Sequence, residues 1–284
     1  MARLLITNFT PDEGGVYLLD ADTSELTRLT EQPSRGITRG PDGYYVVGTR
    51  GFVWRLAPES WEVTPIGDTA LHGAHDFRWI DDHFYLVASD SNRIARFDRE
   101  LRPVDDLQII RQEDDVCHAN CLAQVNGQLL LTIFTLSPGR RQEKNETDAW
   151  AYEGKVLRLD WETGGYQVLY EPLAQPHSLV WHEEQLYCCE SYTSEVTLLN
   201  LREKSKEVVC RLHGFVRALV FTEGMAYVGI SGWKKKQTPL QKLLTRSRME
   251  CGIVELDPAT WKPRRQFTIP GQQVYDMLVL DPAP

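Results

Sequence analysis

The sequence of 284 residues contains no apolar run of about 18 residues, the length that a membrane-spanning helix requires. Residues 1–15, MARLLITNFTPDEGG, lack the apolar core of a secretory signal, because their short apolar patch runs directly into polar turn residues. Basic residues are also scarce: 31 Lys and Arg stand against 40 Asp and Glu, and the formal net charge is −9. We therefore expect no membrane partner, no nucleic-acid partner and a cytoplasmic location.

Several catalytic signatures are absent as well. The sequence has no G-x-S-x-G, P-loop, G-x-G-x-x-G or H-E-x-x-H motif, which argues against serine-hydrolase and nucleotide-dependent chemistry. No signature of an organic redox cofactor is visible. Six cysteines, at positions 117, 121, 188, 189, 210 and 251, are spaced neither as a disulfide framework nor as a zinc ribbon. Reduced thiols in a reducing compartment are the expectation.

What the sequence does contain is a repeat. A turn followed by an alternating apolar run, which ends near an acidic or polar residue, recurs as GGVYLLDADT, GFVWRLAPES, NRIARFDREL, GKVLRLDWET, SEVTLLNLRE and CGIVELDPAT. Before each later copy lies a pair of apolar runs joined by a turn, for example HDFRWIDDHFYLVAS and HSLVWHEEQLYCCES. Alternation with a period of two residues and turns rich in Asp, Asn and Gly predict β-strands.

The spacing of the repeat predicts the fold. The markers lie at positions 20, 57, 98, 160, 200 and 257, and a four-stranded propeller blade takes ~40–45 residues. We predict an all-β, six-bladed β-propeller, a single domain over residues 1–284. The terminal segments LLITNF and VYDMLVLD are expected to share one blade and close the ring. A pair of β-sandwiches, the alternative, leaves six matched units and an orphan C-terminal strand unexplained.

Two intervals are long because they contain inserts, at about residues 137–153 and 232–250. Both fall between the second and third strands of their blades, so we expect them on the face where the innermost strands begin. Long loops on one rim of a rigid scaffold often carry function.

That face also gathers polar residues. Aligning the starts of the innermost strands places an unusual ring at the channel mouth, where core packing would favour Val, Ile or Ala. The ring consists of Arg35, His75, Asn120, His177, Arg217 and, in the last unit, Tyr275 or Asp276. His118, two residues before Asn120, is expected to face the same side.

The ring suggests acid–base chemistry on an anion. Arg35 and Arg217 offer forked donors that match carboxylate, sulfate or phosphate. His75 and His177 can exchange protons, with His118 assisting. Polar neighbours extend the candidate set: Asp76 as an orienting carboxylate, and Ser178, Glu190, Asn120, Tyr275 and Asp276 as substrate contacts. The acidic residues 113–115 are expected to form a solvated turn.

A metal is a further expectation. His75, His118 and His177 match the number of protein ligands in an open catalytic metal site. Zinc, manganese, iron or copper would be admissible there, and no other cofactor is implied. The competing interpretation is that the three rings pair with each other and with water.

These motifs carry a resemblance. GAHDFRW (73–79), CHANCLA (117–123), QPHSLVWHEEQLYCCESYTSEV (175–196) and GFVRALVFTEGMAYVGIS (214–231) resemble an uncharacterised, mainly bacterial family of propellers. That family brings no established activity. The blade pattern is more distantly similar to gluconolactonase, regucalcin and strictosidine-synthase-like propellers. The resemblance to those implies a divalent ion held by Glu, Asn and Asp, of which only Asn120 matches.

Two functions remain open at this stage. The first is a non-redox enzyme, a lyase, isomerase, cyclase or hydrolase, acting on a small anionic molecule at the channel mouth. The second is a non-catalytic propeller that binds a ligand or a protein. An enzyme requires the Arg and His side chains to converge, whereas a scaffold can pair them with one another.

Overall fold

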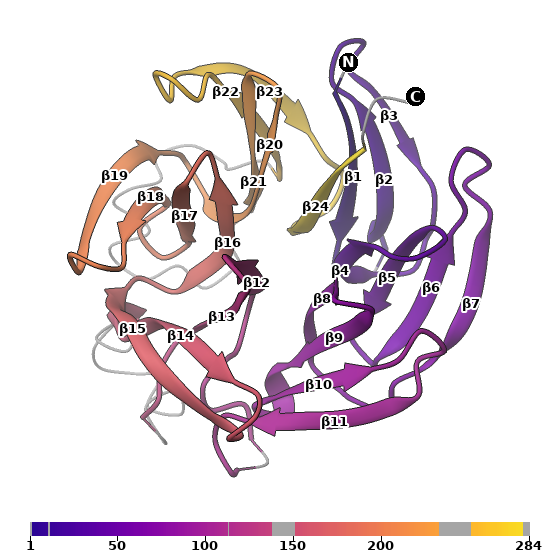
Figure 1. Ribbon diagram of the computed structural model, residues 1–284. Coiled ribbons are helices and arrows are strands. Elements are labelled where there is room, and N and C mark those ends of the chain that lie inside the picture. Colours follow the sequence, from indigo (N-terminus) through magenta and orange to yellow (C-terminus); the bar gives the residue numbers. More distant parts are fainter. Residues whose placement is uncertain (1, 11, 113, 138–150, 233–250, 281–284) are drawn as a thin grey trace.

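The computed structural model shows six four-stranded antiparallel sheets arranged as blades around a central axis (Figure 1). The structure describes residues 2–10, 12–112, 114–137, 151–232 and 251–280. The predicted six-bladed β-propeller is therefore confirmed. Both inserts fall largely outside the described residues, although each departs from the end of a second strand as predicted.

The first three blades, each given from its innermost to its outermost strand, include the blade that closes the ring. Blade 1 consists of β24 (Val274–Leu280), β1 (Arg3–Asn8), β2 (Gly15–Asp20) and β3 (Glu25–Arg28). Blade 2 consists of β4 (Ser34–Arg39), β5 (Tyr44–Gly48), β6 (Phe52–Leu56) and β7 (Val63–Asp68). Blade 3 consists of β8 (Ala74–Ile80), β9 (His83–Ala88), β10 (Arg93–Phe97) and β11 (Pro103–Gln108), with a short 3₁₀ helix (Ser89–Ser91) after β9.

The other three blades follow the same order. Blade 4 consists of β12 (Leu122–Val125), β13 (Gln128–Ile133), β14 (Gly154–Asp160) and β15 (Gly165–Leu173). Blade 5 consists of β16 (Pro176–His182), β17 (Gln185–Glu190), β18 (Glu195–Asn200) and β19 (Ser205–Arg211). Blade 6 consists of β20 (Phe215–Thr222), β21 (Met225–Ser231), β22 (Gly252–Leu256) and β23 (Pro263–Thr268).

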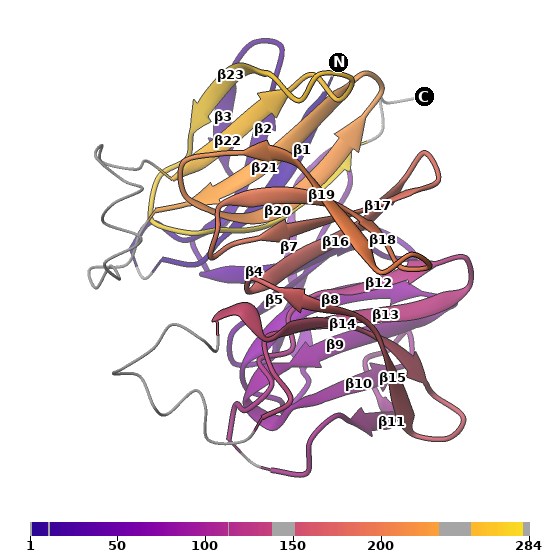
Figure 2. The ribbon, with the colours of Figure 1, turned by 90° about the vertical axis from the view of Figure 1, so that its left-hand side faces the viewer.

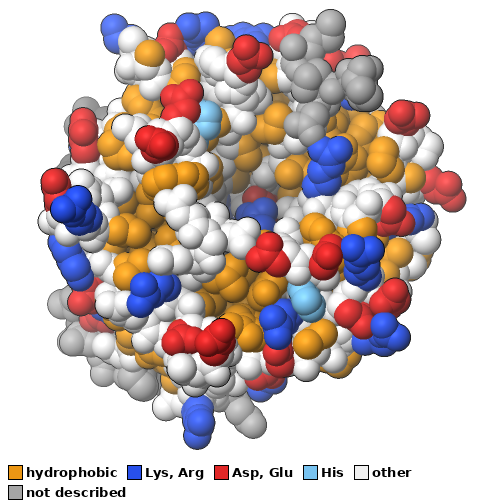
Figure 3. Space-filling view, in the orientation of Figure 1, with side chains coloured by type: hydrophobic (Ala, Val, Ile, Leu, Met, Phe, Trp, Pro, Cys, Tyr) orange, Lys and Arg blue, Asp and Glu red, His pale blue; other side chains and the backbone are white. Residues whose placement is uncertain are grey.

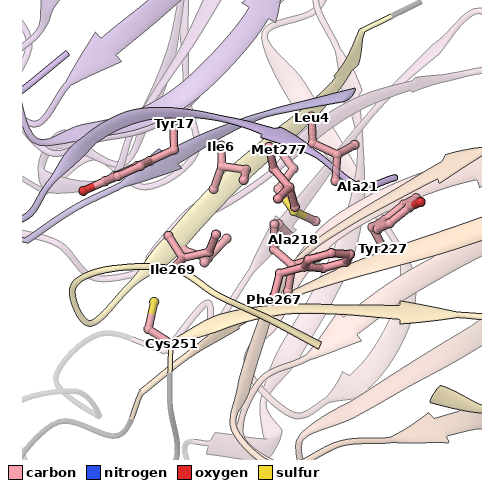
Figure 4. Packing of buried hydrophobic residues seen from close by; sticks show 13 residues of the cluster. Leu4, Ile6, Tyr17, Ala21, Ala218, Tyr227, Cys251, Phe267, Ile269 and Met277 are labelled. Atoms are coloured by element: carbon pink, nitrogen blue, oxygen red, sulfur yellow. The ribbon is translucent and has the colours of Figure 1, made fainter. Parts of the chain in front are cut away.

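Blade 1 joins the two ends of the chain. The C-terminal β24 pairs antiparallel with β1, with Leu5 opposite Leu278. The seam between blades 6 and 1 is sealed by one apolar cluster, in which Ile6 and Met277 face Phe267 and Tyr227 (Figure 4). The closure predicted from the repeat is therefore confirmed.

The apolar core lies between the blades. The second strands are almost entirely buried, as in β9 and β17, whereas outer strands such as β7 and β23 expose most of their residues. Charged outer strands protect the sheet edges from pairing with other chains. Figure 2, a side view, shows the blades stacked around the axis with their hairpins at the two faces.

The recurring acidic marker has a local role. Asp20 and Asp160 are the last residues of their third strands, and Asp98 and Asp257 directly follow theirs. Each carboxylate accepts from backbone amides two to four residues later. Asn200 does the same in blade 5. Such Asx turns direct the chain into the fourth strand, so the repeat signal reflects turn chemistry.

Figures 1 and 3 view the ring from the face on which the innermost strands end. The centre of this face is hollowed, and the hollow contains both a basic and an acidic side chain (Figure 3). The predicted polar ring lies at the other end of the channel, where the innermost strands begin.

Candidate functional site

Bulges shape the starts of the innermost strands. Register shifts occur in blades 2, 3, 5 and 6 and opposite Tyr275 in blade 1. The residues inside these irregularities are Arg35, Gly36, His75, Ser178, Arg217 and Tyr275. A bulge bends its strand and re-aims a side chain. Five blades thus depart from regular alternation at the level of the predicted ring.

His75 is the hub of the resulting cluster. Its ring centroid lies 5.0 Å from that of His118, 5.6 Å from that of His177 and 4.9 Å from that of Tyr275. Phe134, which directly follows β13 of blade 4, packs against the other two histidines, with ring centroids 4.5 Å from His118 and 5.3 Å from His177. The structure therefore brings together the three predicted histidines and Tyr275.

The two arginines share the aromatic ring of Tyr275. The guanidinium carbon of Arg217 lies 4.4 Å from the Tyr275 centroid, and that of Arg35 lies 5.1 Å away. Arg35 also lies over Phe9 at 4.7 Å and donates to the carbonyl of Ala74 at 2.9 Å. Neither arginine forms an ion pair with any residue that the structure describes. Two partly buried cations are therefore left without neutralising carboxylates.

His177 holds Arg217 in place. Arg217 donates to Nε2 of His177 at 3.1 Å and to Oε1 of Gln273 at 3.0 Å. Because a guanidinium only donates, His177 accepts at Nε2 and carries its proton on Nδ1. That nitrogen faces Oγ of Ser191 at 2.7 Å, and Ser191 donates onward to the carbonyl of Val216. Burial and the charge of Arg217 hold the pKa of His177 well below its usual value.

His75 differs because one of its nitrogens is unused. Its side chain is 4% exposed, and Nε2 is buried with no hydrogen-bond partner among the described residues. Burial, followed by the charges of His118 and Arg217, holds the pKa of His75 well below 6.5. His75 is therefore a neutral imidazole at physiological pH, the form that can accept a proton.

His118 and Asn120 reach the site from a loop, because β12 begins only at Leu122. His118 has a left-handed φ of 45°, and its Nδ1 lies 2.7 Å from Oδ2 of Asp115. The expectation of a solvated turn was therefore wrong for Asp115, whose Oδ1 also accepts from the His118 amide at 3.0 Å. Asn120 donates to the carbonyl of His118, while its Oδ1 is buried without a described partner.

Three predicted site residues act between blades instead. The side chains of Asp76, Ser178 and Asp276 accept from backbone amides of the next blade, at Leu122 (2.7 Å), Leu219 (3.0 Å) and Ile37 (3.2 Å). Cys121 occupies the same position and accepts from Leu179 at 3.3 Å. At Gly36, the equivalent position in blade 2, a Cβ would lie 2.5 Å from the amide nitrogen of Phe77. These side chains hydrogen-bond neighbouring blades to one another. Asp76, predicted to orient a histidine, has no described hydrogen bond to one and bonds instead to Phe77, Arg78 and Leu122.

Arg78 links two of those carboxylates. Its guanidinium lies 3.0 Å from Asp76 and 3.2 Å from Asp276, and it donates to the carbonyl of Ile37 at 3.1 Å. Burial raises the pKa of Asp76 to about 6, against the lowering effect of Arg78 and with a further raising effect from Asp276. One guanidinium thus serves two carboxylates below the ring.

Glu190 also lies apart from the ring. Its carboxylate is fully buried and accepts from Nζ of Lys206 at 2.7 and 2.8 Å and from the amide of Ala174 at 2.7 Å. It anchors β19 and the loop before β16, and Ser191 beside it supports His177.

The metal centre predicted at the three histidines stays a prediction. Among the residues that the structure describes, no group of three His, Cys, Asp or Glu side chains is placed to hold an ion. His177 already uses both ring nitrogens, at Ser191 and at Arg217. No chemical step below depends on a metal.

The neutral histidines predict a pH dependence. The pKa values of His75 and His177 are lowered on folding. Below pH 6.5 the unfolded chain therefore binds protons that the folded protein does not bind. The free energy of unfolding should therefore fall as pH drops below 6.5, with a limiting slope of about 1.4 kcal/mol per pH unit for each histidine. Urea denaturation between pH 5 and 7.5 measures this slope. A His75→Gln/His177→Gln double variant should lose it, and equal slopes in the two proteins would contradict the assignment.

Fold and site together define a six-bladed β-propeller whose channel carries two arginines, neither in an ion pair with a described residue, beside neutral histidines. The chain belongs to a family described as a domain of unknown function, DUF4915, which matches residues 67–283. A crystal structure of a nidogen/laminin complex matches with a TM-score of 0.70 and 13% identity over 98% of each chain. At this identity the likeness shows the fold alone. No curated protein matches, and no described helix is long and apolar enough to cross a membrane.

Proposed function

We propose that this propeller is an enzyme that binds a small organic anion at the ring and moves a proton with His75. One observation carries the proposal: in the part of the chain that the structure describes, two arginines without carboxylate partners lie beside a buried neutral histidine whose Nε2 has no hydrogen-bond partner. Buried cations without counterions are unfavourable, so a site of this kind is stabilised by an anion.

Each residue of the ring has a distinct role in this scheme. Arg35 and Arg217 bind the anion, and His177 positions Arg217 through Nε2. His75 accepts a proton from the bound molecule. His118, which Asp115 holds and which lies edge-on to His75, exchanges protons on the other side. The chemistry is of the lyase, isomerase, cyclase or hydrolase type, since it requires proton transfer and no electron transfer.

The surroundings support a cytoplasmic enzyme. All six cysteines are free and buried, as suits a reducing compartment. We further propose that the His-Asp, Cys-His-x-Asn, Pro-His-Ser and Gly-Phe-x-Arg elements are the signature of the family, because they supply the ring and the contacts between blades.

Thermal-shift measurements test the proposal directly. The wild type should be stabilised by at least one member of a panel of small carboxylates, phosphates and sulfates, by about 2.7 kcal/mol at a hundredfold excess over the dissociation constant. Proton exchange or turnover of that anion should then drop at least a hundredfold in His75→Gln, while binding persists. Elemental analysis of the purified protein decides whether a metal contributes.

Two outcomes would overturn the proposal. If no anion stabilises the wild type, the ring is a set of mutually paired structural groups. If an anion binds but His75→Gln leaves its conversion unchanged, or no conversion occurs, the protein is a non-catalytic binding propeller.

A further inference from the structure

Polar atoms of the channel-mouth ring that have no partner among the described residues indicate the chemistry of its ligand. Three of them are buried without hydrogen-bond partners among the described residues: Nε of Arg35, Nε2 of His75 and Oδ1 of Asn120. Almost every buried polar atom in a folded protein is hydrogen-bonded, so each of these atoms calls for a partner in the working protein. Their chemistry restricts the ligand, because Arg35 can only donate and Oδ1 of Asn120 can only accept.

The charges restrict the ligand further. His75 and His177 are neutral, so the net charge at Tyr275 comes from two guanidiniums, whose carbons both lie within 5.1 Å of its ring centroid. Asp115 is a carboxylate that contacts this cluster, and both of its oxygens face His118. Asp76 and Asp276 are engaged by Arg78 and by backbone amides.

The two arginines are close enough for their positive charges to repel each other. Burial and the charge of Arg35 lower the pKa of Arg217, although Tyr275 acts in the opposite direction. The partners of Arg217 among the described residues are all neutral: His177, Gln273 and the face of Tyr275. A monoanion leaves one of these two cations uncompensated, whereas a dianion neutralises both.

We infer that the ligand is a small dianion that also carries a hydroxyl or amine donor: one negative charge for each arginine, and the donor for Oδ1 of Asn120. This inference rests on the proposed function and narrows its substrate class. Hydroxylated dicarboxylates and hydroxylated phosphomonoesters share this chemistry. His75, whose ring contacts those of Tyr275 and His118, then faces the carbon skeleton of the bound dianion.

Calorimetric titration of the wild-type protein at pH 7.5 and low salt tests the inference. The probes are dicarboxylates of three to six carbons with and without a hydroxyl, such as malate and succinate, and the matching monocarboxylates, such as lactate. Glycerol 3-phosphate represents the phosphomonoesters. At least one hydroxylated dianion should bind tenfold or more tightly than both its monoanionic and its non-hydroxylated counterpart.

Two variants separate the two parts of the inference. Asn120→Ala should abolish the preference for the hydroxyl and keep the preference for two charges, whereas Arg35→Gln should equalise dianion and monoanion. Arg102→Gln, which alters an exposed arginine of a surface ion pair, is the matched control and should change neither. Far-ultraviolet circular dichroism verifies that each variant is folded.

The outcomes distinguish this inference from the proposed function. If every monoanion binds as tightly as its dianionic counterpart, the inference is overturned while anion binding stands. An Asn120→Ala variant that still prefers the hydroxyl overturns the assignment of the donor. If none of the anions binds, the proposed function itself fails.

Discussion

The Arg217→Gln variant is expected to lose tenfold to a hundredfold in affinity for the anion that the wild type binds, and to gain stability at the same time. The affinity falls because a hydrogen bond between a charged donor and an anion contributes about 1.5–3 kcal/mol, and the neutral amide retains little of it. The side-chain amide of the introduced Gln keeps an N–H donor, the kind of group that Nε2 of His177 accepts from Arg217 in the wild type.

Stability should rise because the substitution removes a partly buried charge that has no carboxylate partner among the described residues. Burial and repulsion from Arg35 lower the pKa of Arg217, which means that the folded state disfavours the charged form of this side chain. A gain of about 1 kcal/mol would raise the melting temperature by roughly 2–4 °C in a protein of this size. Opposite changes in binding and stability are typical of residues kept for function.

Differential scanning fluorimetry and calorimetric titration measure both quantities on the same samples, with Arg102→Gln as the exposed control. The interpretation fails if Arg217→Gln melts at a lower temperature than the wild type and binds anions as well as before. Arg217 would then be a packing residue on Tyr275, and the stacking distance of 4.4 Å would be its whole role.

The fold could be predicted from the sequence because its signals are local and repeated. Each Asx turn places an Asp or Asn at the end of a third strand or directly after it, and alternation marks the strands on either side. The closing blade followed from a C-terminal strand that had no partner of its own. Pairing between β24 and β1 then satisfies the backbone groups of both strands.

The site could be predicted only in part, because strand alternation cannot assign a bulge. Position 75 and position 76 are both polar, and a shift of one residue exchanges the side chain that enters the ring with the one that enters the blade interface. The structure resolves the ambiguity: His75 contacts the other histidines, and Asp76 bonds to the next blade. Ser178 and Asp276 follow the same pattern.

Other contacts of the ring came from segments that carry no periodic signal. Phe9 and Gln273 lie in loops and contact Arg35 and Arg217, respectively. Asp115 could have been found from its spacing of three residues before His118, which suits a turn closed by a side chain. The metal prediction stays untested, because a count of histidines does not show which of their nitrogens are free to bind an ion.

The Arg78→Met variant is expected to lose about 3–5 kcal/mol of unfolding free energy at pH 7.5, the usual cost of removing one member of a buried ion pair. Asp76 and Asp276 would both keep their burial and lose their shared cation, which lies 3.0 and 3.2 Å away. The carbonyl of Ile37 would also lose a donor. Urea denaturation measures the loss, and Arg102→Met, on the exposed surface, should change the free energy by less than about 0.5 kcal/mol.

Acidification should reduce this loss, because protonation removes the uncompensated charges. The pKa of Asp76 is about 6 even with Arg78 present, raised by burial and by Asp276. Without Arg78 it should rise further, so the folded variant binds protons that the unfolded chain releases above pH 4, and its free energy of unfolding increases as pH falls. The difference from the wild type should therefore be smaller at pH 5 than at pH 7.5. If the variant is unfolded at pH 7.5, refolding at pH 5 would equally show that protonation removes the destabilising charges. A loss of unfolding free energy that stays constant or grows on acidification would contradict the prediction. Arg78 would then stabilise the propeller by packing and not by charge.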